Sequence, residues 1–571
     1  MQTKEPIISF RDFSFQYYSQ KEPTLHEINL DVYPGEKILI VGPSGCGKST
    51  LAHCINGLIP YAYRGTITGT LRVKGKTPEE SSLFERSKTV GTVLQDSDGQ
   101  FVGLTVGEDI AFSLENSLVA QAEMTETVQR VADMVDMGTL LKSSPFELSG
   151  GQKQRTALAG VMVDDVELLL FDEPLANLDP LTGKTAIDLI DRLQRDYDKT
   201  VVIIEHRMED VLYRHVDRVV VLSDGRIVSD SAPDELVCSD VLRKLGIREP
   251  LYVTALKYAG VTLTGDLHPG YLETLDVERV RAELERWQAQ QPPHTEKELG
   301  ETLLSVRDLS FQYTARRRIL RHISFDVRRG EMVSIVGTNG AGKSTLAKVI
   351  CGFCKPDEGD ILFKGESIRD WTIKERSFKI GYVMQNPNQM ISKTQIFDEV
   401  ALGLRIRRMS EEEVKERVWK ALKICGLYPM RNWPIAALSF GQKKRVTIAS
   451  ILVMEPEILI LDEPTAGQNY RHYTDIMEFL RELNRQGITI LMITHDMHLM
   501  LEYTPHAIVI AGGEKIGDDS AVAILTDAAM AERANLKLTS LYELAQKARL
   551  NDPQGFVRQF IDHEEDSKHE S

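Results

Sequence analysis

The chain has 571 residues, of which 42% are hydrophobic and 27% charged, an ordinary composition for a globular protein of several domains. Its formal net charge of −16 argues against nucleic-acid binding through a basic surface, and no apolar stretch approaches the ~18 residues that a membrane-spanning helix requires. The first residues, MQTKEPIISF, lack the basic segment and apolar run of a signal peptide, so we expect the six cysteines to be reduced thiols in the cytosol.

The chain opens with strand-like patterns that lead to a phosphate-binding loop. IISFRDFSFQY (7–17) and LHEINLDV (25–32) alternate as strands do. The apolar run KILIVG then enters GPSGCGKST (42–50), which matches the P-loop pattern GxxxxGK[ST]. Its glycines let backbone N–H groups approach phosphate oxygens at the start of a helix. We expect this loop to bind ATP, with Lys48 on the terminal phosphates and Ser49 on Mg²⁺. The ATP-binding residues expected here are Gly42, Gly45, Gly47, Lys48, Ser49 and Thr50.

A helical insertion and two buried strands come next. The interval between Gln95 and Leu148 is rich in helix formers and is expected to form a small helical subdomain. LLLFDE (168–173) and TVVIIEH (200–206) are continuous apolar strands, which indicate a parallel sheet covered on both faces. Carboxylates at the carboxyl end of such a strand face the ligand crevice. We therefore expect Asp172 to hold Mg²⁺ and Glu173 to polarise the attacking water.

The same order of motifs returns in the second half. LSVRDLSFQY (304–313) repeats ISFRDFSFQY, GTNGAGKST (337–345) repeats the P-loop, and ILILDE repeats the strand that ends in an acidic pair. The corresponding residues are Gly337, Gly340, Gly342, Lys343, Ser344 and Thr345 for ATP, Asp462 for Mg²⁺ and Glu463 for the attacking water. The sequence thus predicts duplicated domains over 1–245 and 301–540, a spacer with a short helix over 246–300, and a C-terminal helix with a polar, disordered tail over 541–571.

An octapeptide that occurs in both halves of the chain indicates a protein family. LSGGQKQR (148–155) and LSFGQKKR (438–445) each precede an Asp-Glu pair. With P-loop, glutamine, octapeptide, acidic pair and histidine in this order twice, the chain resembles the ATP-binding cassette (ABC) ATPases. The resemblance implies an α/β fold of two tandem P-loop NTPase domains, each with a mostly parallel sheet core, an antiparallel β subdomain and a helical subdomain. It also implies hydrolysis of ATP to ADP and phosphate with ATP and Mg²⁺ as cofactors.

The resemblance assigns further residues by their matching positions. In that family the octapeptide of one domain caps the γ-phosphate held by the other domain's P-loop, which implies intramolecular pairing of the two domains. The capping residues would be Ser149, Gly151, Ser439 and Gly441. Gln95 and Gln385 would touch Mg²⁺ and relay the nucleotide state to a partner, and His206 and His495 would contact the γ-phosphate. Tyr17 and Tyr313 would stack on adenine, although they could instead be core residues of their strands.

Three classes of ABC ATPase fit a chain of this kind: an importer ATPase with separate membrane subunits, a translation factor on the ribosome, and a DNA-repair ATPase. Heptad runs and zinc-spaced cysteines, which favour the last, are missing from the sequence. QDSDGQFVGLTVGEDIAFSLEN (95–116) and QNPNQMISKTQIFDEVALGLR (385–405) resemble the ATPases of energy-coupling factor importers for vitamins and transition metals. This implies a peripheral protein on the cytoplasmic face of the cell membrane. Its partners would be an integral membrane scaffold and a substrate-binding membrane subunit, with no nucleic acid; the translation factor remains the alternative.

Two further expectations concern the partner and the symmetry of the sites. Apolar residues after each glutamine are expected to border grooves for a partner helix, with ordinary core packing as the alternative; they are Phe101, Val102, Met390 and Ile391. The pair Leu178-Asp179, which crosses the domain interface in this family, corresponds to Gln468-Asn469 in the second copy, and Phe440 replaces an octapeptide glycine. We therefore predict unequal sites, with faster turnover at the site of Lys343 and Glu463.

Overall fold

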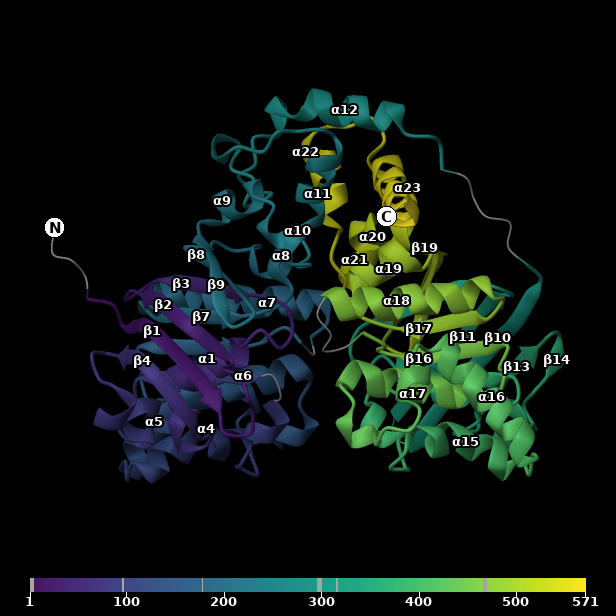
Figure 1. Cartoon of the computed structure of the whole chain (residues 1–571), viewed down its shortest axis with the longest axis horizontal. Coiled ribbons are helices and arrows are strands. Elements are labelled where there is room, and N and C mark those ends of the chain that lie inside the picture. Colours follow the sequence, from purple (N-terminus) through teal and green to yellow (C-terminus); the bar gives the residue numbers. More distant parts are fainter. Residues whose placement is uncertain are drawn as a thin grey trace. The chain divides into compact units, whose positions relative to one another are not determined.

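The computed structural model describes residues 5–94, 97–176, 178–294, 300–314, 317–465 and 470–570 (Figure 1). The chain divides into two compact units, Met1–Trp287 and Gln288–Ser571. Among the described residues, no helix is both long enough and apolar enough to cross a bilayer.

The first unit is built on a six-stranded sheet that is parallel except at one edge. In spatial order its strands are β5 (Val90–Val93), β6 (Leu168–Asp172), β7 (Thr200–Ile204), β3 (Lys37–Val41), β8 (Arg218–Ser223) and β9 (Arg226–Ser231). Only the last pair, β8 and β9, is antiparallel. The carboxyl ends of β3, β6 and β7 therefore lie at one edge of the sheet, where a parallel α/β sheet binds its ligands.

A second, antiparallel sheet and several helices complete this unit. The antiparallel sheet has the order β2 (Leu25–Val32), β1 (Ile8–Tyr17) and β4 (Gly65–Val73). The longer helices are α1 (Lys48–Ile55), α4 (Val106–Asn116), α5 (Gln121–Met134), α6 (Gly150–Met162), α7 (Pro180–Tyr197), α11 (Leu251–Tyr258) and α12 (Arg281–Gln290). The shorter ones are α2 (Leu58–Tyr61), α3 (Leu83–Ser87), α8 (Met208–Val211), α9 (Pro233–Cys238) and α10 (Val241–Lys244).

Alternate residues of each central strand enter different cores. Leu39 and Val41 of β3 pack with the helical side, including α4 to α7. Ile38 and Ile40 pack with the antiparallel sheet and α1. Because both faces are covered, these strands are apolar throughout rather than alternating, as the sequence indicated.

The second unit repeats this architecture. Its core sheet has the order β15 (Ile380–Val383), β16 (Ile458–Asp462), β17 (Thr489–Ile493), β12 (Met332–Gly337), β18 (His506–Ala511) and β19 (Glu514–Ser520). The other sheet has the order β11 (Arg317–Arg328), β10 (Thr302–Thr314), β13 (Glu358–Phe363) and β14 (Glu366–Ser367). The longer helices are α13 (Lys343–Ile350), α15 (Ile396–Ile406), α16 (Glu411–Ile424), α17 (Phe440–Leu452), α18 (Tyr470–Arg485), α22 (Ser540–Lys547) and α23 (Pro553–Glu570), and the shorter ones are α14 (Ile373–Arg376), α19 (Met497–Tyr503), α20 (Ala521–Leu525) and α21 (Ala528–Arg533). The repeated strand order confirms the predicted α/β fold of two tandem P-loop domains.

The spacer after the first domain packs on that domain. Helix α11 buries Leu251, Val253 and Leu256. The Tyr271 hydroxyl lies 3.0 Å from the backbone nitrogen and 2.8 Å from the backbone oxygen of Val216, two residues before strand β8 begins. Residues 246–287 thus belong to the first compact unit.

The C-terminal tail is not disordered as we expected, because α23 continues to Glu570. Phe556, Val557 and Phe560 form one apolar stripe of this helix and are fully buried. Glu565, within the polar segment, lies 3.6 Å from the guanidinium of Arg481 on α18. Burial of the apolar stripe fixes the first turns, and the polar residues extend the same helix.

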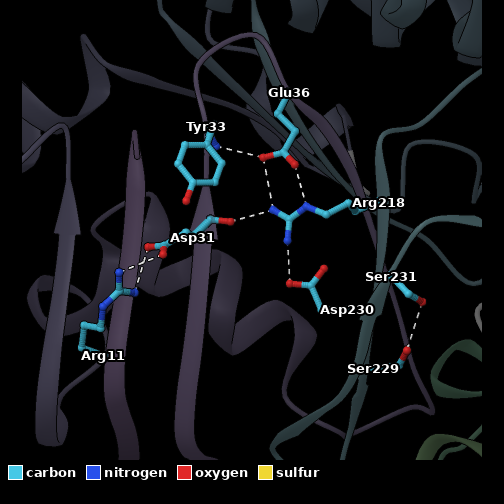
Figure 2. Close-up of polar contacts among 8 residues, drawn as sticks. All are labelled: Arg11, Asp31, Tyr33, Glu36, Arg218, Ser229, Asp230 and Ser231. Carbon is cyan, nitrogen blue, oxygen red and sulfur yellow. Dashed lines mark hydrogen bonds and ion pairs between the residues drawn. The ribbon is translucent and has the colours of Figure 1, made fainter. Parts of the chain in front are cut away.

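Arg218 joins the two sheets of the first unit at the amino end of β8 (Figure 2). Arg218, the first residue of β8, donates through Nε to Glu36 at 2.6 Å and through Nη1 to Asp230 at 2.6 Å. Its Nη2 atom donates to the carbonyl oxygen of Asp31 at 2.7 Å, and the Asp31 carboxylate accepts from Arg11. In the second unit His506 occupies the corresponding position, between Glu331 and Asp518.

Candidate active sites

The first P-loop closes around its own lysine. Gly45 and Gly47 have φ of 77° and 105°, left-handed values that favour glycine. Lys48 Nζ donates to the carbonyl oxygens of Gly42 and Pro43 at 2.8 and 2.9 Å, so the ammonium group lies inside the loop. Ser49 and Thr50 follow in the first turn of α1. This geometry offers backbone N–H groups and a positive charge to phosphate oxygens at a helix N-terminus.

The second P-loop has the same local geometry. Gly340 and Gly342 have φ of 78° and 100°. Lys343 Nζ donates to the carbonyl oxygens of Gly337 and Thr338 at 2.8 and 3.0 Å. Ser344 and Thr345 lie in the first turn of α13. Both loops therefore have the geometry expected of a phosphate-binding loop, and contact of the named residues with phosphate stays a prediction.

In the first unit the acidic pair meets the predicted histidine. Asp172 ends β6, and Glu173 follows with a left-handed φ of 51°, which directs its side chain away from the strand. His206 Nε2 lies 2.7 Å from Glu173 Oε1. Burial acts to raise the pKa of Glu173, but the hydrogen bond and charge of His206 hold it below its usual value. Glu173 is thus kept as a carboxylate, the form that can accept a proton from water.

The second unit repeats this pair. Glu463 has a left-handed φ of 46°, and its Oε1 lies 2.8 Å from Nδ1 of His495. Asp462 ends β16 and is buried. The structure therefore places each predicted histidine beside the glutamate of its own unit. Contact of either histidine with a γ-phosphate stays a prediction.

The residues near Asp172 suit a hard cation. Asp172 Oδ1 is buried and has no hydrogen-bond partner among the described residues. Burial, followed by the charge of Glu173, raises the pKa of Asp172 to about 6. A buried carboxylate oxygen without a donor is costly unless a cation satisfies it. With the Ser49 hydroxyl, it supplies the oxygen ligands that Mg²⁺ prefers, so the residues present fit the predicted metal.

Ser149 and Ser439 begin the octapeptide helices α6 and α17. The side-chain oxygen of each caps its own helix by accepting the backbone N–H of Gln152 or Gln442. Gly151 approaches α7 closely, since a Cβ atom at this position would lie 2.5 Å from Thr182 Cγ2. Gly441 follows in the first turn of α17. Capping of the opposite P-loop by these residues stays a prediction.

Both predicted adenine-stacking tyrosines lie beside their P-loop helices. The Tyr17 hydroxyl is 3.1 Å from Thr50 Oγ1, and that of Tyr313 is 3.4 Å from Thr345 Oγ1. Tyr313 is exposed, which disfavours the alternative of a core residue. In the first unit Tyr63 lies edge-on to Tyr17, with 6.4 Å between ring centroids. Tyr63 was not predicted from the sequence; the aromatic segment PYAYRG (60–65), which the second copy does not repeat, could have indicated it.

The structure describes one of the two predicted glutamines and the apolar residues that follow them. Gln95 lies outside the described residues, as do Gln468 and Asn469. Gln385 is described and exposed. Met390 and Ile391 pack against the helical core, which is the alternative given for them, whereas Val102 is 63% exposed. The predicted interface residue Asp179 caps α7 by accepting the backbone N–H of Thr182 at 2.9 Å.

Two residues near the second site escaped the sequence analysis. Lys444 of α17 is only 1% exposed, and its Nζ donates to the carbonyl oxygens of Met384 and Gln385 at 2.8 and 2.9 Å. Burial lowers the pKa of Lys444 to about 8. The corresponding Gln154 of the first unit instead donates to the carbonyl oxygen of Pro174 at 2.7 Å. The second residue, Tyr382, donates a hydrogen bond to Asp462.

Two P-loops, each beside a strand that ends in an acidic pair, define a nucleoside triphosphatase with tandem domains. Comparison with known families gives a model described as ABC transporter over residues 25–176 and 320–466. A second model, described as ATP-binding cassette cobalt transporter, matches residues 239–311.

Relatives of known sequence match nearly the whole chain. ABC transporter ATP-binding proteins of Clostridium perfringens and Enterococcus faecalis are 56% and 57% identical to it, each over 98% of both chains. A solved structure of cbiO1 from Clostridium perfringens, described as part of the ABC transporter complex cbiONQ, is 35% identical over 43% of this chain and 99% of that chain, with a TM-score of 0.39. The chain belongs to the ABC transporter ATP-binding family, and its activity is that of an ATPase.

Proposed function

We propose that the chain energises an importer of the energy-coupling factor type for a vitamin or metal-ion micronutrient. It would act as a peripheral ATPase subunit on the cytoplasmic face of the cell membrane, bound to a scaffold subunit and a substrate-binding subunit. The observation that carries this proposal is the cobalt-transporter family model over residues 239–311, because it covers the spacer rather than the P-loops common to all ABC ATPases. The translation-factor alternative gains no support from relatives whose names refer to transport.

At each site the chain's own residues would perform four tasks. The P-loop backbone and Lys48 or Lys343 would bind the phosphates. Ser49 and Asp172, and their counterparts in the second unit, would hold Mg²⁺, which neutralises phosphate charge when bound. Glu173 or Glu463 would accept the proton of the attacking water. His206 would keep Glu173 oriented and ionised, as their 2.7 Å contact and the lowered pKa of Glu173 indicate, and His495 would orient Glu463.

A loop before the first helical insertion supports a partner site. The carboxylate of Asp109 accepts the backbone N–H groups of Val102 and Gly103 at 2.8 and 3.0 Å, which fixes the loop at the start of α4. Val102 and Leu104 are 63% and 80% exposed on this fixed loop. Because the loop is already held in one conformation, its exposed apolar side chains would lose little conformational entropy when a partner helix packs on them.

The second unit fixes the corresponding loop in the same way. Glu399 accepts the backbone N–H groups of Ser392 and Lys393 at 2.8 and 2.7 Å. Trp433 and Ile406, in the same helical subdomain, are exposed. We therefore infer one helix of the membrane scaffold for each unit.

Phosphate release by the purified chain tests the chemistry. Replacing both Glu173 and Glu463 by Gln should lower the rate by ~10²–10⁴, while ATP binding persists. Glu126→Gln, on an exposed face of α5, is the matched control and should leave the rate unchanged. An unchanged rate in the double variant would show that neither glutamate is the base.

Fractionation of cells tests the transport role. The parent chain should sediment with membranes and co-purify in detergent with an integral membrane protein. Leu104→Glu should weaken that co-purification, and Leu118→Glu, an exposed apolar residue at the far end of α4, should not. Recovery of the parent chain on ribosomes would favour the translation factor instead.

A further inference from the structure

The two Asp carboxylates assigned to Mg²⁺ have different partners. Asp462 Oδ2 accepts a hydrogen bond from the Tyr382 hydroxyl at 2.9 Å, and the Ser344 hydroxyl also bonds this carboxylate. Asp172 Oδ1 is buried without a hydrogen-bond partner among the described residues. The two sites thus differ at the group that would contact the metal.

The difference arises at one residue of the neighbouring strand. Tyr382 in β15 pairs with Ile460 in β16, two residues before Asp462. Thr92 in β5 has the same register, paired with Leu170 two residues before Asp172. The Thr92 hydroxyl lies 3.4 Å from Nδ2 of Asn56, on the helix side of the site.

The surroundings of Tyr382 hold its ring in place. Its ring contacts Phe353, with 5.9 Å between centroids, and packs against the core between β12 and the antiparallel sheet. Cys351 takes the place that Asn56 has in the first unit, and this buried thiol is a weak competitor for the tyrosine hydroxyl. Asp462 is therefore the hydrogen-bond acceptor of Tyr382.

We propose that Tyr382 is a positioning residue of the second catalytic centre that orients Asp462 for Mg²⁺. Its O–H occupies Oδ2 and fixes the rotation of the carboxylate, so the metal-binding geometry exists before the ion arrives. The first centre has Thr92 at this position, and Oδ1 of its Asp172 has no hydrogen-bond partner among the described residues. The inference rests on the proposed assignment of Asp462 to Mg²⁺.

This orientation predicts a difference in metal affinity. Groups that hydrogen-bond a metal ligand change affinity by ~10–100-fold when they are removed. Tyr382→Phe removes only the hydroxyl and keeps the ring, so packing in the core is retained. The expected result is weaker metal binding at the second centre by ~10-fold, with no change at the first.

Mn²⁺ titration followed by electron paramagnetic resonance tests this in the full-length chain with saturating AMP-PNP. Lys48→Ala isolates the second centre, and Lys343→Ala isolates the first. In the Lys48→Ala background, Tyr382→Phe should raise the Mn²⁺ dissociation constant by ~10-fold, and Thr92→Val should leave it unchanged. In the Lys343→Ala background, Tyr382→Phe should have no effect.

Two further measurements separate the possible failures. AMP-PNP affinity in EDTA and the melting temperature should be the same with Tyr382 or Phe, because the ring and its packing are retained; a change in either would mean that the hydroxyl acts on nucleotide binding or on folding rather than on the metal ligand. Asp462→Asn should weaken Mn²⁺ binding at least as much as Tyr382→Phe does. Weakening by Asp462→Asn alone overturns the role of Tyr382, whereas no weakening by either substitution overturns the assignment of Asp462 as well.

Discussion

We expect His506 to give the second unit a pH-dependent stability that Arg218, at the corresponding position, does not give the first. Its Nδ1 lies 2.7 Å from Glu331 and its Nε2 lies 2.7 Å from Asp518. Both nitrogens face carboxylate oxygens, so both must donate, and only the protonated imidazolium has two N–H groups. Lys515, 2.7 Å from Asp518, is the other cation at this position.

The size of the effect follows from the pKa of His506. Burial acts to lower it, but hydrogen bonds with Asp518 and Glu331 raise it from 6.5 to about 9. This change corresponds to about 3 kcal/mol of stability, which solvent around the 21% exposed ring reduces to about 2 kcal/mol. Since the folded unit holds the proton more tightly than the unfolded chain, the stabilisation is complete below pH 6.5, declines between pH 6.5 and 9, and is lost above pH 9.

Urea unfolding at several pH values measures this contribution. Three of the four tryptophans, Trp371, Trp419 and Trp433, lie in the second unit, so their fluorescence reports on it. His506→Arg introduces the residue that the first unit has at this position, Arg218, which does not titrate in this range. Between pH 6 and 9.5 the parent should lose about 2 kcal/mol relative to His506→Arg.

The comparison with His506→Arg also removes an opposing effect. Lys444, with its lowered pKa of about 8, adds stability as the pH rises, but it is present in both proteins and cancels. A constant difference between parent and His506→Arg across this range would refute the reasoning.

Three other predictions follow from the sites and the C-terminal helix. Because the pKa of Asp172 is raised to about 6, Mn²⁺ binding to the Lys343→Ala variant should weaken as the pH falls from 7.5 to 5.5, and constant binding would exclude this carboxylate as a ligand. Glu463→Gln should slow ATP hydrolysis more than Glu173→Gln does, as measured by phosphate release, and equal or reversed losses would contradict the predicted asymmetry. Phe560→Ala should destabilise the second unit by about 3–5 kcal/mol in urea unfolding, because the side chain is fully buried, and a loss below about 1 kcal/mol would show that α23 packs loosely.

The sequence was informative where chemistry depends on neighbouring residues. The P-loop around Lys48 and the pair Asp172-Glu173 are contiguous motifs, and each immediately adjoins a buried strand. Because the motifs occur twice in the same order, the sequence also predicted two domains that share one fold. Glu173 and His206 follow adjacent parallel strands, so their proximity could be predicted from the sequence. Their direct hydrogen bond was not predicted.

Other contacts were hidden because they depend on register and on long separations. Tyr382 and Asp462 are 80 residues apart, and their contact requires the pairing of β15 with β16. His506 reaches Glu331 across 175 residues, at the position where the other copy has arginine. The C-terminal helix was not predicted to reach the end of the chain because its last residues are polar, a composition typical of disorder. The buried residues Phe556 and Phe560, which precede them, hold the helix in place.

Lys444 gives the octapeptide helix of the second unit different hydrogen-bond partners from those of the first. In the second unit, its two hydrogen bonds connect α17 to the backbone of Met384 and Gln385, in the loop that follows β15. In the first unit, Gln154 ties α6 to Pro174, one residue after Glu173. A movement of this helix would therefore act on the residues that follow Glu173 in the first unit and on the loop after β15 in the second.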